Sequence, residues 1–287
     1  MPELPEVHIT ARRLGDALAG ARIESAAAPG INALKTFSPP LDVLAGRQIA
    51  GVRRIGKHLV VDVVDVSDGL HLLLHLMSAG RLQLYDKRAT LRDRSSRLLV
   101  RLDDGRELRL REFGTRQAAW VKLLDGAALA ADEALATLGP DAWPDPPHDL
   151  AALLSPQGAR PLQAVLRDQR VIAGIGRSWV DEILWVARLS PFKRAGELSA
   201  EEAVALREAM VDRLGTAVAL YEETVHRPIP DKLPLPLQVH RRHGEPCPRC
   251  GTTLEAIHYE DQTLAYCPQE QTGGRVLKDR RLSRLLR

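Results

Sequence analysis

The N-terminal stretch up to Gly20 carries apolar side chains at helical spacing. These side chains recur three or four positions apart, at Val7, Ala11, Leu14 and Leu18. Such spacing places them on one face of a helix. Pro5 and Glu6 suit a first helical turn, because proline needs no backbone donor there and an acid is favourable at a helix N-terminus. We therefore predict a helix that starts near Pro5 and ends before Gly20.

From about residue 21 to residue 125 the hydrophobic pattern is that of β-strands. Leu108 and Leu110 alternate with Arg109 and Arg111, as expected for a strand with one buried face. Turn signals such as DDGR separate the apolar runs. Strands at such short intervals predict an antiparallel β-sandwich or barrel. The runs lie at 47–64, 70–76, 80–86, 96–113 and 117–124.

The pattern becomes helical between about 149 and 225. A proline-rich stretch, LGPDAWPDPPHD at 138–149, precedes this region and is typical of a linker. A long helix inside the region opens with Ser199 and Glu202 at the spacing of a capping box. The stretch 226–238 contains four prolines and is predicted to be a second linker. We therefore predict a β-sandwich domain over 1–130, a helical domain over 145–227, and a cysteine-containing domain with a basic tail over 239–287.

Composition limits the class of protein. With 287 residues, 45% of them hydrophobic, the chain suits two or three globular domains. No apolar run approaches the roughly 20 residues of a membrane span, and the acidic N-terminus carries no apolar export signal. The net charge of +3 and the pI of about 8.9 favour a polyanionic partner. All three cysteines lie between 247 and 267, which favours a metal site in a reducing cytoplasm over a disulfide scaffold.

Pro2 offers unusual chemistry once Met1 is removed. A secondary amine that adds to an aldehyde-level carbon forms a cationic iminium, which draws electrons from the neighbouring bonds. An α-amine has a pKa of about 8, against about 10.4 for lysine, so far more of it is neutral and nucleophilic. Glu3 and Glu6 are then placed to carry protons around that nitrogen. The alternative is a stiff, acidic start to the chain without chemistry.

The cysteines show the spacing of a metal-binding ribbon. Cys247 and Cys250 form one C-x2-C pair, and Cys267 with Glu270 occupies the position of a second. Four cysteines at this spacing would predict a structural zinc ion on a hairpin. Here Glu270 stands at the fourth position, where His243 or His258 could compete with it. The alternative is a finger that has lost its metal and is held by the packing of its hairpin.

Two further patterns suit a polyanion. Gly174 and Gly176 flank a turn into a helix whose N-terminal amides could hold a phosphate, although a tight corner in the core has the same pattern. Basic residues also recur along the predicted strands, where they could contact phosphates or form a solvated face. These residues are Arg53, Arg54, Lys57, Arg97, Arg101, Arg109, Arg111 and Arg116.

Taken in order, the motifs resemble those of the formamidopyrimidine-DNA glycosylase/endonuclease VIII family of base-excision repair enzymes. The resemblance covers nearly the whole chain. It implies an α+β fold with an N-terminal antiparallel β-sandwich, a helix-two-turn-helix domain, and a C-terminal β-hairpin zinc finger. The motifs are PELPEV at 2–7, GKHLVV around Lys57, LGPD at 138–141, LRDQRVIAGIG and DEILW within 166–185, and GEPCPRCG and YCP within 244–268.

The resemblance also implies an activity. It predicts a monomeric bifunctional DNA glycosylase and abasic-site lyase that excises oxidised bases from double-stranded DNA. In that reaction Pro2 attacks C1′ of the damaged nucleotide, and the iminium drives elimination of the 3′ and then the 5′ phosphate. Glu3 corresponds to the acid that assists sugar ring opening, and Glu6 to a second acid. Lys57 corresponds to a lysine that contacts a DNA phosphate.

The sequence departs from the family at positions that bear on DNA binding. Arg177 replaces the asparagine of the G-I-G-N motif, Gln163 stands where purine-specific members have a lysine, and Gln262 stands near the position of a finger arginine. Ungapped alignment puts Ser78 where the family inserts a methionine into the DNA, although Met77 is adjacent. The motif REFG resembles the family's R-R-F-G. The candidates for DNA contact are therefore Met77, Arg111, Phe113, Arg116, Arg177 and Gln262.

These departures leave the preference for oxidised purines or pyrimidines undecided. They also leave an alternative function, a catalytically silent protein that binds lesions or abasic sites. The combination of Pro2, Glu3, Glu6 and Lys57 favours the enzyme, because a pure binding protein has no need of a free secondary amine.

Overall fold

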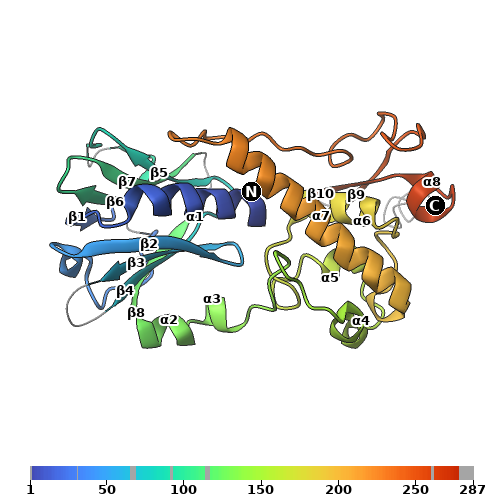
Figure 1. The fold of residues 1–287 in the computed structure, drawn as a ribbon, viewed down its shortest axis with the longest axis horizontal. Coiled ribbons are helices and arrows are strands. Elements are labelled where there is room, and N and C mark those ends of the chain that lie inside the picture. The colour runs from blue at the N-terminus through green and yellow to red at the C-terminus, as the bar shows by residue number, and fades with distance from the viewer. Residues whose placement is uncertain are drawn as a thin grey trace, which may run out of the picture. The chain divides into compact units, whose positions relative to one another are not determined.

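The computed structural model describes residues 2–30, 32–64, 69–90, 93–113, 117–259 and 262–277. The chain divides into two compact units (Figure 1). The first comprises Met1–Thr137 and Val218–Leu233, and the second comprises Leu138–Ala217 and Pro234–Arg287. Within the described part of the chain, no helix is both long and apolar enough to cross a membrane.

The predicted N-terminal helix is confirmed as α1 (Leu4–Leu18). Pro5 occupies its second position, where a missing N–H costs nothing because the first backbone donors of a helix have no partner inside the helix. The apolar face predicted from the sequence is buried, with Val7, Leu14 and Leu18 fully covered. Gly20 follows with φ of +80°, the left-handed conformation that ends many helices.

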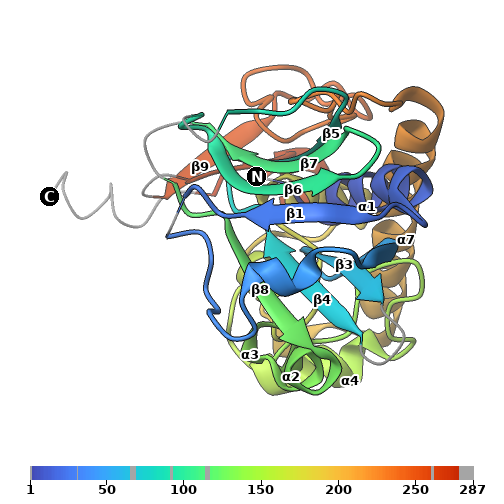
Figure 2. The same cartoon turned by 90° about the vertical axis from the view of Figure 1, so that its left-hand side faces the viewer.

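Two antiparallel four-stranded sheets form the rest of the first unit, together with the short turn η1 (Leu41–Leu44). Figure 2 shows one sheet above the other, so the prediction of a β-sandwich is confirmed. One sheet has the order β1 (Ile23–Ala27), β6 (Ser96–Leu102), β7 (Glu107–Glu112), β5 (Gly80–Tyr85). The other has the order β2 (Gln48–Ile55), β3 (His58–Val64), β4 (Leu70–His75), β8 (Trp120–Asp125).

The two central strands of the second sheet, β3 and β4, are buried on both faces. Leu59 and Leu74 pair across β3 and β4 and are fully buried. On the opposite face, Val60 and Leu73 cluster with Leu124 and with Leu129 of α2 (Gly126–Ala131). The adjoining α3 (Glu133–Ala136) supplies partly buried Leu135 to the same cluster. Cover on both sides explains why β4 contains three consecutive leucines, Leu72, Leu73 and Leu74, instead of a strict alternation.

The second unit holds the helical region and the cysteine segment. The capping box that opens α7 is confirmed, because the Ser199 N–H donates to the Glu202 carboxylate at 2.9 Å and the Glu202 N–H donates to Ser199 Oγ at 3.2 Å. The last turns of α7, from Val218 onward, belong to the first unit. The elements are α4 (Leu150–Leu154), η2 (Ser155–Gln157), α5 (Leu162–Val165), α6 (Arg177–Val186), η3 (Ala195–Glu197), α7 (Ala200–Thr224), β9 (Glu255–Tyr259), β10 (Gln262–Tyr266) and α8 (Pro268–Thr272).

The helical pattern does not produce a continuous helix between α5 and α6. Residues 166–176 form turns around the side chain of Gln169 instead. Its amide nitrogen donates to the backbone carbonyls of Arg167 at 2.8 Å and Ile175 at 2.9 Å, and its oxygen accepts the Gly174 N–H at 3.0 Å. One side chain thus satisfies backbone groups that a helix would have paired.

Both proline-rich stretches predicted to be linkers are fixed to their units by hydrogen bonds. In the first, the Ala142 N–H donates to the Ala173 carbonyl at 2.9 Å, and the Ala173 N–H donates to the Pro140 carbonyl at 2.8 Å. In the second, the Gln83 amide of β5 donates to the Ile229 carbonyl at 2.6 Å. Prolines exclude helix from these segments, but backbone carbonyls remain free to accept bonds from neighbouring elements.

Replacement of Gly139 in the LGPD motif tests this close packing. A Cβ added at Gly139 would lie 2.4 Å from the Val171 carbonyl oxygen, closer than side-chain atoms approach one another. We expect Gly139→Ala to lower the free energy of unfolding by about 1–3 kcal/mol, because the backbone must shift to relieve the overlap. Urea unfolding followed by circular dichroism measures this change. Gly51→Ala is the control, since nothing lies within 4 Å of its added Cβ, and an equal loss there would contradict the explanation.

Candidate active site

The N-terminal acids are organised by the first turn of α1. Glu3 is the N-cap residue, and its N–H donates to Glu6 Oε2 at 2.8 Å. Both residues are buried, with exposed fractions of 2% and 7%. Pro2 lies directly before them and is half-buried. The helix N-terminus stabilises negative charge at this point, so the structure can hold two acids beside the N-terminal residue.

A tyrosine that sequence reasoning did not identify completes this group. Tyr221 of α7 is fully buried, and its hydroxyl donates to Glu6 Oε1 at 3.0 Å. Burial raises the pKa of Tyr221, and the negative charge of Glu6 raises it further, so the hydroxyl stays protonated and remains a donor. Each oxygen of Glu6 therefore has its own donor. The carboxylate is fixed in position as a result.

Salt bridges and hydrogen bonds fix the end of α7 on α1. Arg13 Nε donates to the Val225 carbonyl at 2.7 Å, and Arg13 Nη2 donates to the Glu222 carbonyl. Arg12 forms an ion pair with the Glu222 carboxylate at 3.3 Å. These bonds hold the segment that carries Tyr221 against the N-terminal helix. No local pattern predicts them, because the partners are separated by about two hundred positions.

Lys57 lies in the tight turn between β2 and β3 and is 6% exposed. The strand register sets His58 opposite His75, and His75 opposite Trp120. Burial lowers the pKa of His58 to about 4. Burial, then the charges of His58 and Lys57, lower the pKa of His75 to about 3. Both imidazoles are therefore neutral at neutral pH, and the structure places a lysine charge beside an uncharged aromatic group.

Met77 occupies an unusual backbone conformation beside this group. Its φ of +49° is rare for a residue with a side chain. The Met77 N–H donates to His75 Nδ1 at 3.0 Å, which holds the conformation in place. The side chain is half-buried and does not belong to the buried core. Strained backbone of this kind is common at functional sites, although it does not define the function.

Arg111 and Phe113 lie together at the end of β7. The guanidinium of Arg111 stacks 4.5 Å from the Phe113 ring centre. It also donates to the Tyr85 hydroxyl at 3.0 Å and to Ser95 Oγ at 3.2 Å. Phe113 is 37% exposed, so it is not a core residue. The remaining candidate of this motif, Arg116, lies outside the described residues.

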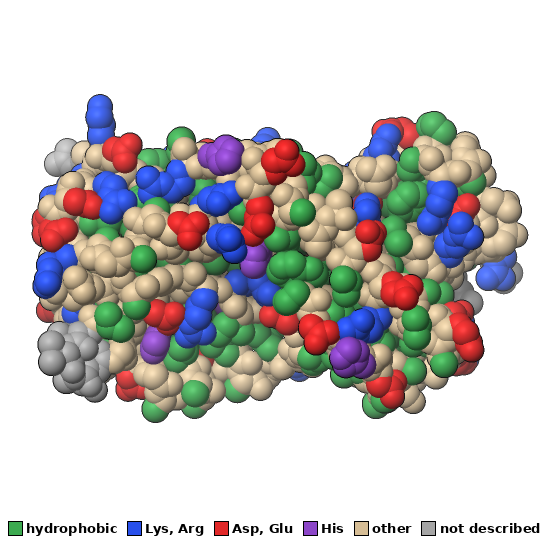
Figure 3. All heavy atoms as spheres, viewed as in Figure 1, with side chains coloured by type: hydrophobic (Ala, Val, Ile, Leu, Met, Phe, Trp, Pro, Cys, Tyr) green, Lys and Arg blue, Asp and Glu red, His purple; other side chains and the backbone are tan. Residues whose placement is uncertain are grey.

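Most of the other basic residues along the strands take part in ion pairs within the protein. Figure 3 shows Lys and Arg side chains interspersed with Asp and Glu on the face in view. Ion pairs of this kind reduce the charge that these strands can present to a polyanion. The pairs are Arg53–Asp62 at 2.7 Å, Arg97–Glu112 at 3.7 Å, Arg101–Glu107 at 3.3 Å and Arg109–Glu107 at 2.7 Å.

Arg177 is the first residue of α6 in the second unit and is exposed. It lines a cavity of about 530 Å³ together with Gln163 and Arg167, a second cation that sequence reasoning did not identify. Arg177 in the first turn of α6 is suitably placed for a phosphate, although the carboxylates of Asp168 and Asp181 line the same cavity. Gln262 begins β10, where it pairs with Tyr259, and its side chain lies outside the described part.

Two buried acids of the DEILW motif hold the cysteine segment on α6. Glu182 accepts the N–H groups of Gln238, Val239 and His240 at 2.8–2.9 Å. Asp181 contacts His240 Nδ1 at 2.7 Å and accepts an N–H from β10 at 3.1 Å. Burial raises the pKa of Asp181 to about 6. The motif therefore positions the hairpin through hydrogen bonds to buried carboxylates.

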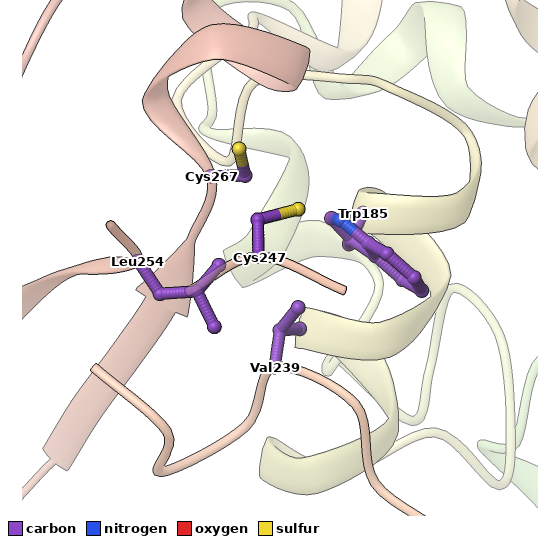
Figure 4. Packing of buried hydrophobic residues seen from close by; sticks show 5 residues of the cluster. All are labelled: Trp185, Val239, Cys247, Leu254 and Cys267. Carbon is purple, nitrogen blue, oxygen red and sulfur yellow. The ribbon is translucent and has the colours of Figure 1, made fainter. Parts of the chain in front are cut away.

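The three cysteines converge as predicted from their spacing. Their sulfur atoms all lie within 4.8 Å of one another, and Cys250 Sγ and Cys267 Sγ are 3.5 Å apart. Sulfurs bound to one tetrahedral zinc at 2.3 Å are separated by about 3.8 Å, so these three residues fit a zinc ion. Figure 4 shows Cys247 and Cys267 packed with Trp185, Val239 and Leu254.

Glu270, the predicted fourth ligand, does not join the three cysteines in this structure. Among the described residues, the group able to share an ion contains the three cysteines and not Glu270. The Glu270 carboxylate contacts Arg249 at 2.9 Å and Arg188 at 3.2 Å. The rings of His243 and His258, the two possible competitors, contact each other with centres 5.7 Å apart. The ligand role of Glu270 stays a prediction.

An N-terminal sandwich with a buried acid pair, a helical unit with exposed arginine, and a tri-cysteine hairpin together define a class of DNA-repair protein. Residues 1–117 match the model of the formamidopyrimidine-DNA glycosylase N-terminal domain, and residues 138–228 match that family's H2TH domain. The chain therefore belongs to the formamidopyrimidine-DNA glycosylase family, and it is a DNA glycosylase of this class.

Individual relatives agree with this assignment. Formamidopyrimidine-DNA glycosylase of Roseiflexus sp. is 34% identical over 94% of this chain and 100% of its own length. An uncharacterized formamidopyrimidine-DNA glycosylase-like protein of Mycobacterium tuberculosis is 45% identical over 52% of this chain and 94% of its own length. Among solved structures, MutM in complex with DNA containing carbocyclic 8-oxo-G matches with a TM-score of 0.82, at 27% identity over 94% of this chain and 100% of that one.

Tyr221→Phe tests whether the tyrosine hydroxyl orients Glu6. The substitution removes one donor and leaves the ring in place, so we expect base excision to slow about tenfold, which corresponds to roughly 1.4 kcal/mol. The acidic limb of the pH–rate profile should move to higher pH, because ionised Glu6 loses a stabilising hydrogen bond. The measurement is single-turnover excision over a range of pH. Thr10→Val is the control, since Thr10 Oγ1 bonds the backbone carbonyl of Glu6 and not its carboxylate. An unchanged pH profile in Tyr221→Phe would count against the role.

Acidification should weaken the fold through His58 and His75. Their pKa values of about 4 and about 3 lie below the usual 6.5. Between these values and 6.5 the unfolded chain binds more protons, so the free energy of unfolding falls as pH is lowered. Phenylalanine at position 58 cannot bind a proton. His58→Phe should therefore reduce the slope of the free energy of unfolding against pH by an amount that corresponds to at most about one proton. Urea unfolding at several pH values measures it. Trp120→Phe is the control, because it alters the same cluster without removing a titratable group, and it should keep the wild-type slope. If His58→Phe also kept the wild-type slope, His58 would not be a source of the pH dependence.

Proposed function

We propose that this protein is a bifunctional DNA glycosylase and abasic-site lyase that excises oxidised bases from double-stranded DNA. The observation that carries the proposal is a buried hydrogen-bonded group that begins directly after Pro2. It consists of Glu3, Glu6 and Tyr221. A protein that only binds DNA has no use for two buried acids beside its N-terminal amine. The family to which the chain belongs supports the same reading.

The proposed reaction starts after removal of Met1, which leaves Pro2 with a free secondary amine. The neutral amine attacks C1′ of the damaged nucleotide, and the base leaves with the electron pair of the glycosidic bond. Glu3 assists opening of the sugar by supplying a proton to the ring oxygen. Glu6, with both oxygens engaged, keeps the Glu3 backbone in place. The resulting iminium has no N–H to lose, so it remains an electron acceptor.

Strand cleavage then follows from the iminium. Loss of a proton from C2′ expels the 3′ phosphate, and a second elimination expels the 5′ phosphate. Hydrolysis of the remaining iminium returns Pro2 as a free amine. The sequence of steps is the β,δ-elimination that the family resemblance implies, and the electron acceptor in it is the iminium itself.

The proposed DNA contacts come from both units. Lys57 in the first unit and Arg177 in the second bind phosphates. The damaged nucleotide leaves the stack to reach Pro2. Half-buried Met77 and exposed Phe113, backed by Arg111, fill the space that it vacates. Arg116 and Gln262 are further proposed contacts on the strength of their motifs. The protein acts as a monomer on chromosomal DNA in the cytoplasm.

The three cysteines are proposed to hold a structural zinc ion. Burial raises the pKa of Cys267 to about 12, so binding of the metal must displace its proton. Zinc would cross-link the two halves of the hairpin and takes no part in the chemistry. Its role is to fix the hairpin on α6.

Borohydride trapping tests the proposed function. The full-length protein is mixed with duplexes that contain 8-oxoguanine, thymine glycol or an abasic site, and the reductant converts an iminium into a stable adduct. We expect trapping on 8-oxoguanine, because the similar structure of MutM is a complex with DNA that contains carbocyclic 8-oxo-G. Mass spectrometry should place the adduct on Pro2 and find Met1 absent. Pro2→Gly should lose base excision and retain at most weak lyase activity through its primary amine.

Each other outcome has a defined meaning. Trapping on the abasic site alone would leave a lyase without glycosylase activity on these two lesions. DNA binding without any trapping would overturn the enzyme and favour the silent binding protein. Trapping that persists in Pro2→Gly at the wild-type level on a base lesion would assign the nucleophile to another amine.

A further inference from the structure

We infer that Glu270 closes the cysteine hairpin as the anion of a two-arginine ion cluster, and not as the fourth ligand of the metal. The cluster comprises Glu270, Arg249 and Arg188. One oxygen of Glu270, Oε2, contacts both guanidinium groups, with Arg249 Nε at 2.9 Å and Arg188 Nε at 3.2 Å. Only 13% of the Glu270 side chain is exposed. The carboxylate is thus largely shielded from water and forms ion pairs with two cations, the half-buried Arg249 and the exposed Arg188.

The backbone of Glu270 nevertheless lies where a fourth ligand would be expected. It follows Cys267 at the spacing of a C-x2-C pair, and its backbone forms a hydrogen bond with the Cys267 thiol. The side chain, however, is directed to the arginines, and the three sulfurs form the group that could share an ion within the described part of the chain. The position of Glu270 in the sequence is therefore that of a fourth ligand, but its side chain contacts arginines and not the cysteines.

The arginines are themselves held in place. Arg249 lies between Cys247 and Cys250, donates to the Trp185 carbonyl and stacks 4.3 Å from the Trp185 ring centre. Arg188 follows the end of α6 with φ of +56°. The cluster thus links the first cysteine pair, the end of α6 and the helix that carries Glu270. A fourth metal ligand would make the same connection between the two halves of the hairpin.

Ligation by Glu270 would require this cluster to break. Moving the carboxylate to a metal would break both ion pairs, and the half-buried Arg249 would lose the anion that neutralises it and keep only its contacts with Trp185. The metal site therefore has three thiolates and a fourth position for water or another external ligand. The hairpin also has metal-independent support. Val239, Leu254 and Trp185 pack around Cys247 and Cys267 (Figure 4). Glu182 binds the backbone that enters the hairpin.

Two measurements on the full-length protein test this inference, and neither uses DNA, so the result does not depend on the proposed glycosylase activity. The first is hydrogen exchange of residues 239–277 in reduced, chelator-treated protein. The second is the absorption spectrum of the protein loaded with Co²⁺, whose bands report on the ligands. The variants are Glu270→Gln, Glu270→Cys, Arg249→Gln and Arg188→Gln. The control is Glu245→Gln, which breaks the exposed Arg242–Glu245 pair in the same segment.

The ion cluster predicts a specific combination of results. Exchange around β10 and α8 in metal-free protein should rise about tenfold or more in Glu270→Gln and in Arg249→Gln, with little change in Glu245→Gln. The Co²⁺ spectrum of Glu270→Gln should equal that of the wild type, because no ligand is lost. Glu270→Cys should gain sulfur-to-cobalt absorption and bind zinc at least about a hundredfold more tightly.

Ligation by Glu270 predicts the opposite. In that case the Co²⁺ spectrum would change in Glu270→Gln, whereas metal-free exchange would stay at the wild-type rate in both Glu270→Gln and Arg249→Gln. If Glu270→Gln fails to fold, Arg188→Gln decides, because it removes a cation of the cluster and leaves both the candidate ligands and the Arg249–Trp185 contacts intact. Unchanged metal-free exchange in Arg249→Gln or in Arg188→Gln would overturn the inference.

Discussion

The arrangement of the N-terminal site depends on the hydrogen bonding of one buried carboxylate, that of Glu6. One of its oxygens accepts the Glu3 N–H and the other accepts the Tyr221 hydroxyl. A buried charge is costly unless donors surround it, so these two bonds are a condition for placing acids beside Pro2 at all. The contacts of Arg12 and Arg13 with the end of α7 lie close to this group, and they hold Tyr221 within hydrogen-bond distance of Glu6.

The second unit uses the same principle at the hairpin. Glu182 collects three backbone N–H groups, Asp181 joins His240 to β10, and Glu270 joins two arginines. Three buried or nearly buried acids therefore hold the cysteine hairpin in place. In a small zinc finger the metal ion alone has this role. In the ion cluster that we infer, Glu270 makes the connection that a fourth metal ligand would otherwise make.

Much of the fold was accessible from local patterns. The ends of α1, the capping box at Ser199 and the antiparallel strands follow from side-chain period and from the preferences of proline, glycine and acids at helix ends. The turns at 166–176 were not accessible, because their backbone is satisfied by the single side chain of Gln169. The prolines correctly excluded helix from two segments, but they could not reveal which elements those segments contact.

The sequence by itself determined which groups are available: an N-terminal proline followed by two acids, a lysine in a tight turn, and three cysteines at ribbon spacing. Only the tertiary structure decided what those groups touch. It selected Tyr221 as the partner of Glu6, made His58 and His75 neutral by burial, and turned Glu270 toward arginines. Local period records which face of an element is buried, whereas partners far apart in the chain are set by packing, and packing also sets the charge state of a buried group.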